Sequence, residues 1–158
     1  MSDCGRGAEN YPSDCELLEN YRTMARNKPR FDQREEVKKI LPRAESIKLL
    51  LLDVDGVLTD GNLHYSNSGD EIKNFNTQDG FGLRILQDAG IDVGVITARK
   101  SAIVERRAKE LKMRFIYQGA PNKLTAFKEI SKETDLKPFE IAYMGDDWLD
   151  LVLLNRVG

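Results

Sequence analysis

The chain has 158 residues and a formal net charge of −2, and 41% of its residues are hydrophobic. This length fits one domain of ordinary size with a short appendage. The composition is that of a globular protein rather than a disordered one, and the balanced charge gives no reason to expect a nucleic-acid partner. No apolar run approaches the ~20 residues of a membrane span, and the N-terminus lacks a signal-peptide pattern. We therefore expect a cytoplasmic protein.

The first 46 residues differ in pattern from the rest of the chain. The stretch that begins at Ser13 has capping-box spacing and opens an amphipathic segment. A second short helix is expected after Asp32, and it should stop at Pro42 because proline breaks the helical hydrogen-bond pattern. We interpret residues 1–46 as a helical N-terminal extension without a catalytic constellation.

Strands and helices alternate from residue 47 onward. Residues 47–53 form a continuous apolar run, as expected of a central strand that is buried on both faces. Residues 62–75 predict a β-hairpin that turns at residues 67–69. The later elements are expected as a helix ending at Ala89, strand 91–97, helix 101–111, strand 114–117, helix 123–134, strand 141–144 and a helix from Trp148. Residues 47–158 therefore predict an α/β domain, with a Rossmann-like parallel sheet and helices on both faces.

Carboxylates follow two of the predicted strands. Asp53 and Asp55 end the first strand, and Asp146 follows the last. Ligands of open α/β sheets bind beyond the carboxyl ends of the strands, so these side chains are expected to converge. Carboxylates that share a site repel one another unless a cation lies among them, and Mg²⁺ suits such a site. The alternative for Asp-x-Asp-Gly alone is a polar turn with an Asx hydrogen bond.

A hydroxyl and an ammonium group are expected at the same edge of the sheet. Thr97 ends the second parallel strand, which is unremarkable by itself. Lys123 starts a helix, where the helix dipole disfavours a cation by a few tenths of a kcal/mol or more. An anion bound next to Lys123 would make the cation favourable at this position. A solvated surface lysine is the alternative reading.

Three arginines extend the basic character of this edge. Arg107 interrupts the apolar stripe of its helix, while Arg84 and Arg99 lie on segments that lead to the same edge. Taken alone, Arg107 is explained by a side chain that runs along the core edge to solvent, and Arg84 and Arg99 by ordinary surface charges. Together with Lys123, they indicate a substrate that carries more negative charge than a phosphate alone.

These residues resemble the haloacid dehalogenase (HAD) superfamily of phosphotransferases. Residues 53–57 (DVDGV) are similar to its first motif, Thr97 to its second, Lys123 to its third and residues 145–147 (GDD) to its fourth. The finer resemblance is to the 3-deoxy-D-manno-octulosonate 8-phosphate (KDO 8-phosphate) phosphatase subfamily. It is carried by the stretches DVDGVLTDG, FNTQDGFGLRIL, ITARKSAIVERRA, YQGAPNKL and YMGDD.

The resemblance implies a magnesium-dependent phosphatase of lipopolysaccharide biosynthesis. Asp53 is implied as the nucleophile and Asp55 as the general acid and base. Mg²⁺ would be held by Asp53, the Asp55 backbone carbonyl and Asp146, while Thr97 and Lys123 hold the phosphoryl oxygens. The residues implied to bind the sugar acid, besides Asp55 and Lys123, are Asn76, Thr77, Gln78, Asp79, Gly80, Arg84, Arg99 and Arg107.

The chain has no room for a helical cap domain next to its motifs. About twenty residues separate Asp60 from Gly80, which is enough for a hairpin flap only. In the subfamily that the chain resembles, the hairpin of one subunit covers the site of the next, so we expect residues 62–75 to form the interface of a homotetramer. Members of that subfamily continue past the equivalent of Gly158, so a last strand and a tail are expected to be missing from this chain.

Two other functions stay open at this point. A phosphatase for a nine-carbon sugar acid 9-phosphate of the sialic acid type would have almost the same motifs. A non-catalytic assembly subunit is the other, although no catalytic motif is lost. A signalling receiver domain is disfavoured, because it carries its phosphoacceptor Asp on the third strand and the third strand here, RFIYQG, has none.

Overall fold

The computed structural model describes residues 16, 19, 20, 23 and 33–158. The helix predicted from Ser13 falls largely outside the described residues. Residues 41–158 form one compact unit. Among the described residues, no helix has both the length and the apolar character needed to cross a membrane. The domain boundary at residue 46 stays a prediction.

Helix α2 spans Gln33–Glu45 and contains Pro42. The prediction that this helix stops at Pro42 is therefore wrong, because it continues for three more residues. Proline removes one backbone donor, but the chain keeps its helical course. The end comes at Ser46, where the backbone N–H and the hydroxyl both donate to the Arg43 carbonyl, at 3.2 and 2.7 Å.

The central sheet has four parallel strands in the order β5-β4-β1-β6. Strand β1 spans Leu49–Leu52, β4 Asp92–Ile96, β5 Phe115–Tyr117 and β6 Ile141–Met144. The chain runs from β1 outward to β4 and β5, then returns to place β6 on the other side of β1. This reversal of direction next to β1 is where open α/β sheets bind ligands. The predicted parallel α/β architecture is confirmed.

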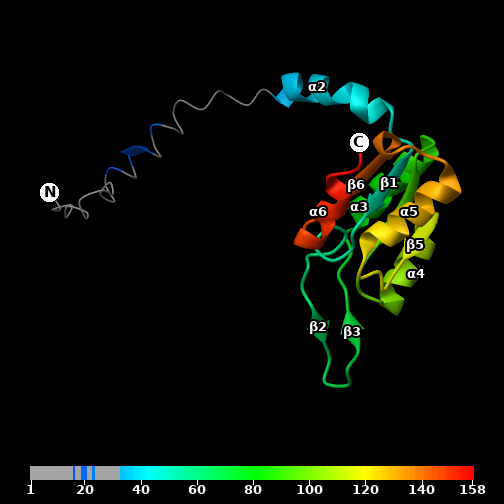
Figure 1. Ribbon diagram of the computed structural model, residues 1–158. Coiled ribbons are helices and arrows are strands. Elements are labelled where there is room, and N and C mark those ends of the chain that lie inside the picture. The colour runs from blue at the N-terminus through cyan, green and yellow to red at the C-terminus, as the bar shows by residue number, and fades with distance from the viewer. Residues whose placement is uncertain (1–15, 17–18, 21–22, 24–32) are drawn as a thin grey trace. The chain divides into compact units, whose positions relative to one another are not determined.

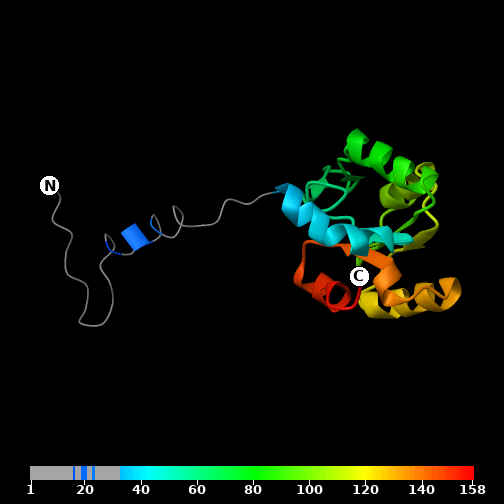
Figure 2. The same cartoon turned by 90° about the horizontal axis from the view of Figure 1, so that it is seen from above.

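Helices cover both faces of the sheet, as Figure 2 shows from above. Helices α3 (Thr77–Asp88) and α4 (Ala102–Glu110) pack on one face, together with Leu52, Val93 and Val95. Helices α5 (Lys123–Thr134) and α6 (Leu151–Leu154) pack on the other, over Leu49 and Leu51. Full burial of one such side chain is worth about 2 kcal/mol. Strand β1 is thus held rigidly from both sides, and with it the residues that follow.

The β-hairpin stands apart from the central sheet, beyond the end of the domain (Figure 1). Strands β2 (His64–Tyr65) and β3 (Glu71–Ile72) pair antiparallel, and Gly69 supplies a φ of 87° in the turn between them. A pair of two-residue strands is not stable on its own. Its position therefore depends on the side-chain contacts that join it to the domain.

Several large apolar side chains are exposed in the described part of the chain. Phe81 on α3 is 70% exposed, and Trp148 is 85% exposed. Trp148 begins a 3₁₀ turn (Trp148–Asp150) that leads into α6, so the last helix is one turn later and shorter than expected. On the hairpin, Leu63 and Ile72 are also exposed.

Candidate active site

Asp53 lies directly beyond the buried end of β1. Its N–H donates to the Met144 carbonyl at 2.9 Å, which continues the pairing with β6 for one residue. Its side chain is buried, with Oδ1 accepting from the Val54 N–H at 2.7 Å. The carboxylate therefore has a fixed direction at the ligand-binding edge of the sheet.

The loop after Asp53 turns sharply around the Val54 carbonyl, which accepts from three consecutive backbone N–H groups of residues 57–59. Gly56 has a φ of +86° in this turn. A Cβ placed on Gly56 would lie 1.9 Å from Oδ2 of Asp146. Glycine is required here because it accepts the left-handed conformation and lets the loop after β6 approach.

Lys123, the first residue of α5, points into the domain rather than into solvent. Its ammonium lies 2.8 Å from Oδ2 of Asp53 and 2.5 Å from Oδ1 of Asp150. The hydroxyl of Tyr143 donates to the same Asp150 oxygen at 2.5 Å, and the Asp147 N–H donates to the other at 3.0 Å. The carboxylates of Asp53 and Asp150 offset the unfavourable position of Lys123 at the start of a helix. The position of Lys123 alone therefore does not require a bound anion. The solvated-lysine alternative is wrong.

The buried groups shift one another's protonation equilibria. Burial raises the pKa of Asp53, against the opposing effects of the Lys123 ammonium and the Val54 N–H. Burial also acts to raise the pKa of Asp150, but hydrogen bonds from Lys123 and Tyr143 outweigh it, and the net direction is downward. Burial raises the pKa of the Tyr143 hydroxyl far above its ordinary value. Asp150 is therefore expected to stay ionised, and the Tyr143 hydroxyl is expected to stay neutral and to donate its hydrogen bond.

Asp53, Asp146 and Asp150 each place a carboxylate oxygen within 4.8 Å of the others. Both oxygens of Asp150 already accept hydrogen bonds, whereas Asp146 is exposed. Mg²⁺ is typically held by one or two carboxylates together with waters and substrate oxygens. Asp53 and Asp146 fit that donor set, and Asp150 supports it by holding Lys123.

The side chain of Asp55 has partners other than the residues of this cluster. Its Oδ1 accepts a short hydrogen bond from Lys73 of the hairpin, and its Oδ2 lies 3.6 Å from Nε of Arg99. The Lys73 side chain is only 1% exposed. Only the backbone carbonyl of Asp55 was expected at the metal, and that expectation stays a prediction.

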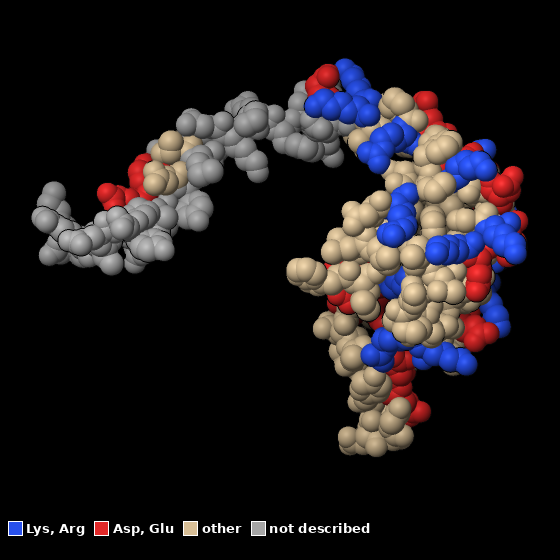
Figure 3. All heavy atoms as spheres, in the orientation of Figure 1, with Lys and Arg blue, Asp and Glu red and all other residues tan. Residues whose placement is uncertain are grey.

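A second network ties the hairpin to the domain. Glu71 accepts from the Ser101 hydroxyl at 2.6 Å and from Arg99 at 3.2 Å, and Arg99 also donates to the Tyr65 hydroxyl at 2.7 Å. The hydrogen bond from Ser101 lowers the pKa of Glu71, with Lys73 and Arg99 acting in the same direction. Figure 3 shows acidic and basic side chains close together where the hairpin joins the domain.

A hollow of about 350 Å³ is lined by all four predicted catalytic residues. Thr97 is buried in its wall, where its hydroxyl oxygen accepts from the Arg99 N–H at 3.4 Å. The lining residues are Asp53, Asp55, Gly61, Thr97, Ala98, Arg99, Lys123, Asp146, Asp147 and Leu149. The convergence that we predicted from four strand ends is present, although the roles of these residues stay predictions.

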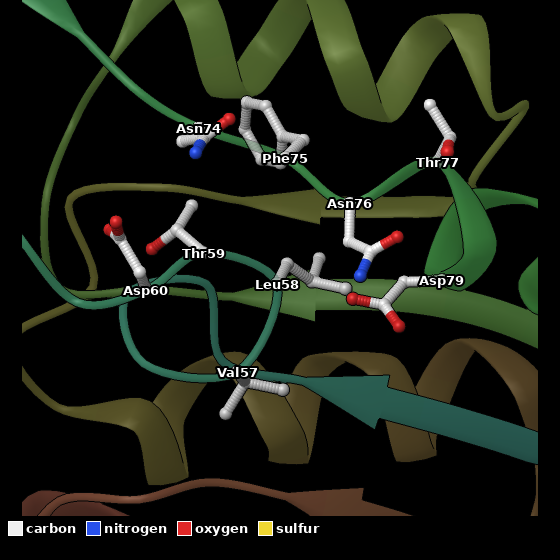
Figure 4. A pocket seen from close by; sticks show the side chains of 9 residues that line it. All are labelled: Val57, Leu58, Thr59, Asp60, Asn74, Phe75, Asn76, Thr77 and Asp79. Carbon is white, nitrogen blue, oxygen red and sulfur yellow. The ribbon is translucent and has the colours of Figure 1, made fainter.

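Other residues that we expected to bind the sugar acid line neighbouring hollows. Asn76, Thr77 and Asp79 line one of about 530 Å³, opposite the loop of residues 57–60 (Figure 4). Arg107 lines a third, of about 430 Å³.

Three more of the expected sugar-acid residues lie on α3. Gln78 is exposed in its first turn and Arg84 is half-buried, and neither lines the hollow around Asp53. Gly80 is buried beneath Arg107, where a Cβ would lie 2.4 Å from a guanidinium nitrogen. Within this single chain, these residues are not gathered around Asp53.

Sequence reasoning missed several residues of these networks. Asp150, Tyr143, Lys73 and Glu71 are not among the predicted site residues. Lys73 and Glu71 sit on a hairpin whose docking no local pattern predicts.

Comparison with known proteins gives consistent matches over about three quarters of the chain, although no protein-family model matches it. The 3-deoxy-D-manno-octulosonate 8-phosphate phosphatase KdsC of Escherichia coli K12 is 43% identical over 119 residues. A structure of the phosphatase of that name from Moraxella catarrhalis, in complex with magnesium, phosphate and KDO, is 44% identical with a TM-score of 0.74. A HAD superfamily (subfamily III A) hydrolase from Legionella pneumophila is 42% identical with a TM-score of 0.77.

The shares of each protein covered by these matches differ. The E. coli match covers 75% of this chain and 63% of that protein, so the chain spans less than two thirds of its curated relative. The Moraxella match covers 76% of this chain and 69% of the other. For the Legionella structure the shares are 80% and 70%.

Proposed function

Because the chain belongs to the KDO 8-phosphate phosphatase family of the HAD superfamily, we propose that it is a magnesium-dependent phosphatase of an eight-carbon sugar acid phosphate. The observation that carries this proposal is the arrangement around Asp53. A buried carboxylate at the end of β1 lies 2.8 Å from a buried ammonium and within reach of Asp146, at the wall of an open hollow. The Moraxella relative is named for a complex with the ligands that this proposal requires.

The proposed first step is attack on phosphorus by a carboxylate oxygen of Asp53. As that bond forms, the bond between phosphorus and the ester oxygen breaks, which gives an aspartyl-phosphate. Lys123 and the Thr97 hydroxyl lie in the same hollow and are suited to hold the phosphoryl oxygens. Because Asp150 and Tyr143 fix the ammonium of Lys123, it does not need to reorganise during the reaction.

Asp55 is proposed to move the protons. It gives a proton to the departing ester oxygen, then takes one from the water that attacks the aspartyl-phosphate, so the enzyme returns to its initial state. Asp53 and Asp146, with the Asp55 backbone carbonyl, would hold Mg²⁺. The cation would neutralise charge on the transferring phosphoryl group.

Phosphate release from a panel of phosphorylated keto-sugar acids tests this function. We expect hydrolysis of the eight-carbon 8-phosphate that requires Mg²⁺ and exceeds hydrolysis of the nine-carbon 9-phosphate. Equal rates on the two, or a preference for the nine-carbon substrate, would contradict the narrower substrate proposal. A folded protein that hydrolyses neither substrate with Mg²⁺ would favour the assembly-subunit function.

We also propose that residues 62–75 join copies of the chain in a homotetramer. The hairpin exposes Leu63, Tyr65 and Ile72, which have no core of their own to cover them. Light scattering should give the mass of four chains, and the double substitution Leu63→Glu and Ile72→Glu should reduce it. A monomeric wild type would contradict this assembly. The cytoplasmic location expected from the sequence stays a prediction.

A further inference from the structure

The two carboxylates of the Asp-x-Asp pair are held by different parts of the chain. Asp53 is held from the domain, by Lys123 of α5 and by the Val54 N–H. Asp55 is held from the hairpin, because its Oδ1 accepts from Lys73. The hairpin of this same chain therefore contacts the proposed acid and base directly.

Lys73 is buried far more completely than a lysine that serves only solubility. Its side chain is 1% exposed, and its ammonium lies between Oδ1 of Asp55 and Oε1 of Glu71, at 3.4 Å from the latter. Burying an ammonium costs several kcal/mol unless carboxylates at good geometry offset that cost. Two carboxylates do so here, so Lys73 is constrained to one position.

The backbone that carries Lys73 is itself anchored. Glu71, two residues earlier, accepts from the Ser101 hydroxyl at 2.6 Å, and Ser101 is the N-cap of α4. Arg99 adds contacts to Glu71 and to Tyr65 across the hairpin. These contacts fix β3 against the strand ends, which lets Lys73 act as a rigid support rather than a mobile cation.

The other oxygen of Asp55, Oδ2, lies near Arg99, a residue of the hollow around Asp53. Oδ2 lies 3.6 Å from Nε of Arg99, and both residues line the hollow that contains Asp53. Lys73 does not line that hollow. It lines the neighbouring hollow that also contains Arg107 and contacts Asp55 through Oδ1, so it is not placed to hold a phosphoryl group beside Lys123.

We propose that Lys73 is a positioning residue for proton transfer, holding Oδ1 of Asp55 so that Oδ2 points at the leaving group. This role rests on the proposed phosphatase function. It also gives the hairpin a task within its own chain, separate from any contact between copies. If Asp55 is misoriented, only the steps that need proton transfer are slowed. The role of Lys73 can therefore be measured by comparing substrates that differ in this need.

The test compares two substrates that differ in their need for a proton. A sugar phosphate leaves as a strongly basic alkoxide and requires the acid, whereas p-nitrophenyl phosphate leaves as a weakly basic phenolate. General acid catalysis is worth ~10²–10⁴-fold, so we expect Lys73→Met to lower kcat on the sugar phosphate by about 10²-fold. With p-nitrophenyl phosphate, where that contribution is small, kcat should change less than about 3-fold. KM should change little for either substrate.

Two further variants complete the design. Lys73→Arg keeps a cation at this position, and we expect it to recover most of the lost kcat on the sugar phosphate. Lys109→Met is the matched control, because Lys109 is an exposed lysine of α4 paired with Glu105 at 2.6 Å, outside the hollow. It should behave as wild type on both substrates. Thermal melting of each variant monitors the fold, and Lys73→Gln replaces Lys73→Met if the latter does not fold.

Each outcome decides the matter. An equal loss on both substrates, or wild-type kcat in Lys73→Met, would overturn the positioning role while leaving the phosphatase function intact. A loss confined to the sugar phosphate and reversed by Lys73→Arg would support it. A wild-type protein that hydrolyses neither substrate with Mg²⁺ would refute the phosphatase function and the role of Lys73 together.

Discussion

The hydroxyl of Tyr143 links the sheet to the buried charges beneath the proposed phosphoryl site. It donates to Oδ1 of Asp150 at 2.5 Å and lies 3.2 Å from the Lys123 ammonium. Tyr143→Phe removes this donor and keeps the ring. Because the side chain is on β6 and nearly buried, no water is expected to replace the hydroxyl without local rearrangement.

The expected loss of stability depends on the hydrogen bonds that Asp150 retains in Tyr143→Phe. A hydrogen bond to a charged group contributes ~1.5–3 kcal/mol. Asp150 retains the Lys123 ammonium and the Asp147 N–H, so it does not become an unpaired buried charge, which would cost ~3–5 kcal/mol. We therefore expect Tyr143→Phe to lower the free energy of unfolding by about 2 kcal/mol. At roughly 4 °C per kcal/mol for a domain of this size, Tm falls by about 8 °C.

Denaturant and thermal unfolding at neutral pH measure this loss, and phosphate release measures its effect on activity. Because Lys123 keeps both carboxylate partners, kcat should fall by less than about 10-fold. Tyr117→Phe, on the half-buried Tyr117 of the edge strand β5, is the matched control and should cost less than Tyr143→Phe. A Tyr143→Phe protein as stable as wild type would refute the view that this hydroxyl supports Asp150.

Three other changes have defined outcomes. Gly56→Ala places a Cβ against Asp146 at a φ of +86°, so Tm should fall and the Mg²⁺ concentration for half-maximal activity should rise. Asp146→Asn should raise that concentration by ~10–100-fold with little change in Tm; an unchanged titration would exclude Asp146 as a ligand. Glu71→Gln tests the pH dependence of stability. The pKa of Glu71 in the folded protein lies below its ordinary value of 4.5. The ionised Glu71 therefore stabilises the fold fully above pH 4.5, and this stabilisation is lost as the pH falls through the folded-state pKa. The Tm difference from wild type should therefore shrink in acid, and a constant difference would contradict this assignment.

Much of the fold follows from local pattern. The run of leucines in β1 predicts a strand buried on both faces, and α5 and β6 have the predicted bounds. These elements are predictable because the period of their apolar residues matches their structure. Pro42 misled the prediction of α2, because the cost of one missing donor is small enough for the helix to continue one more turn.

Only the site residues at the strand ends were predictable from the sequence. Asp53, Thr97, Lys123 and Asp146 follow strands, and the topology of a parallel sheet brings strand ends together. The partner of Lys123 was not predictable, because Asp150 reaches it through a 3₁₀ turn after β6. The contacts of the hairpin depend on where two short strands dock, which is set by tertiary contacts rather than by local sequence.

The central claim is that Asp53 is the nucleophile, and the turnover of Asp53→Asn tests it most directly. Phosphate release from the eight-carbon sugar acid phosphate is measured at saturating Mg²⁺, with melting curves to establish that the variant is folded. An amide cannot form the aspartyl-phosphate, so we predict that kcat falls by at least about 10³-fold. A folded Asp53→Asn protein with wild-type turnover would contradict the account.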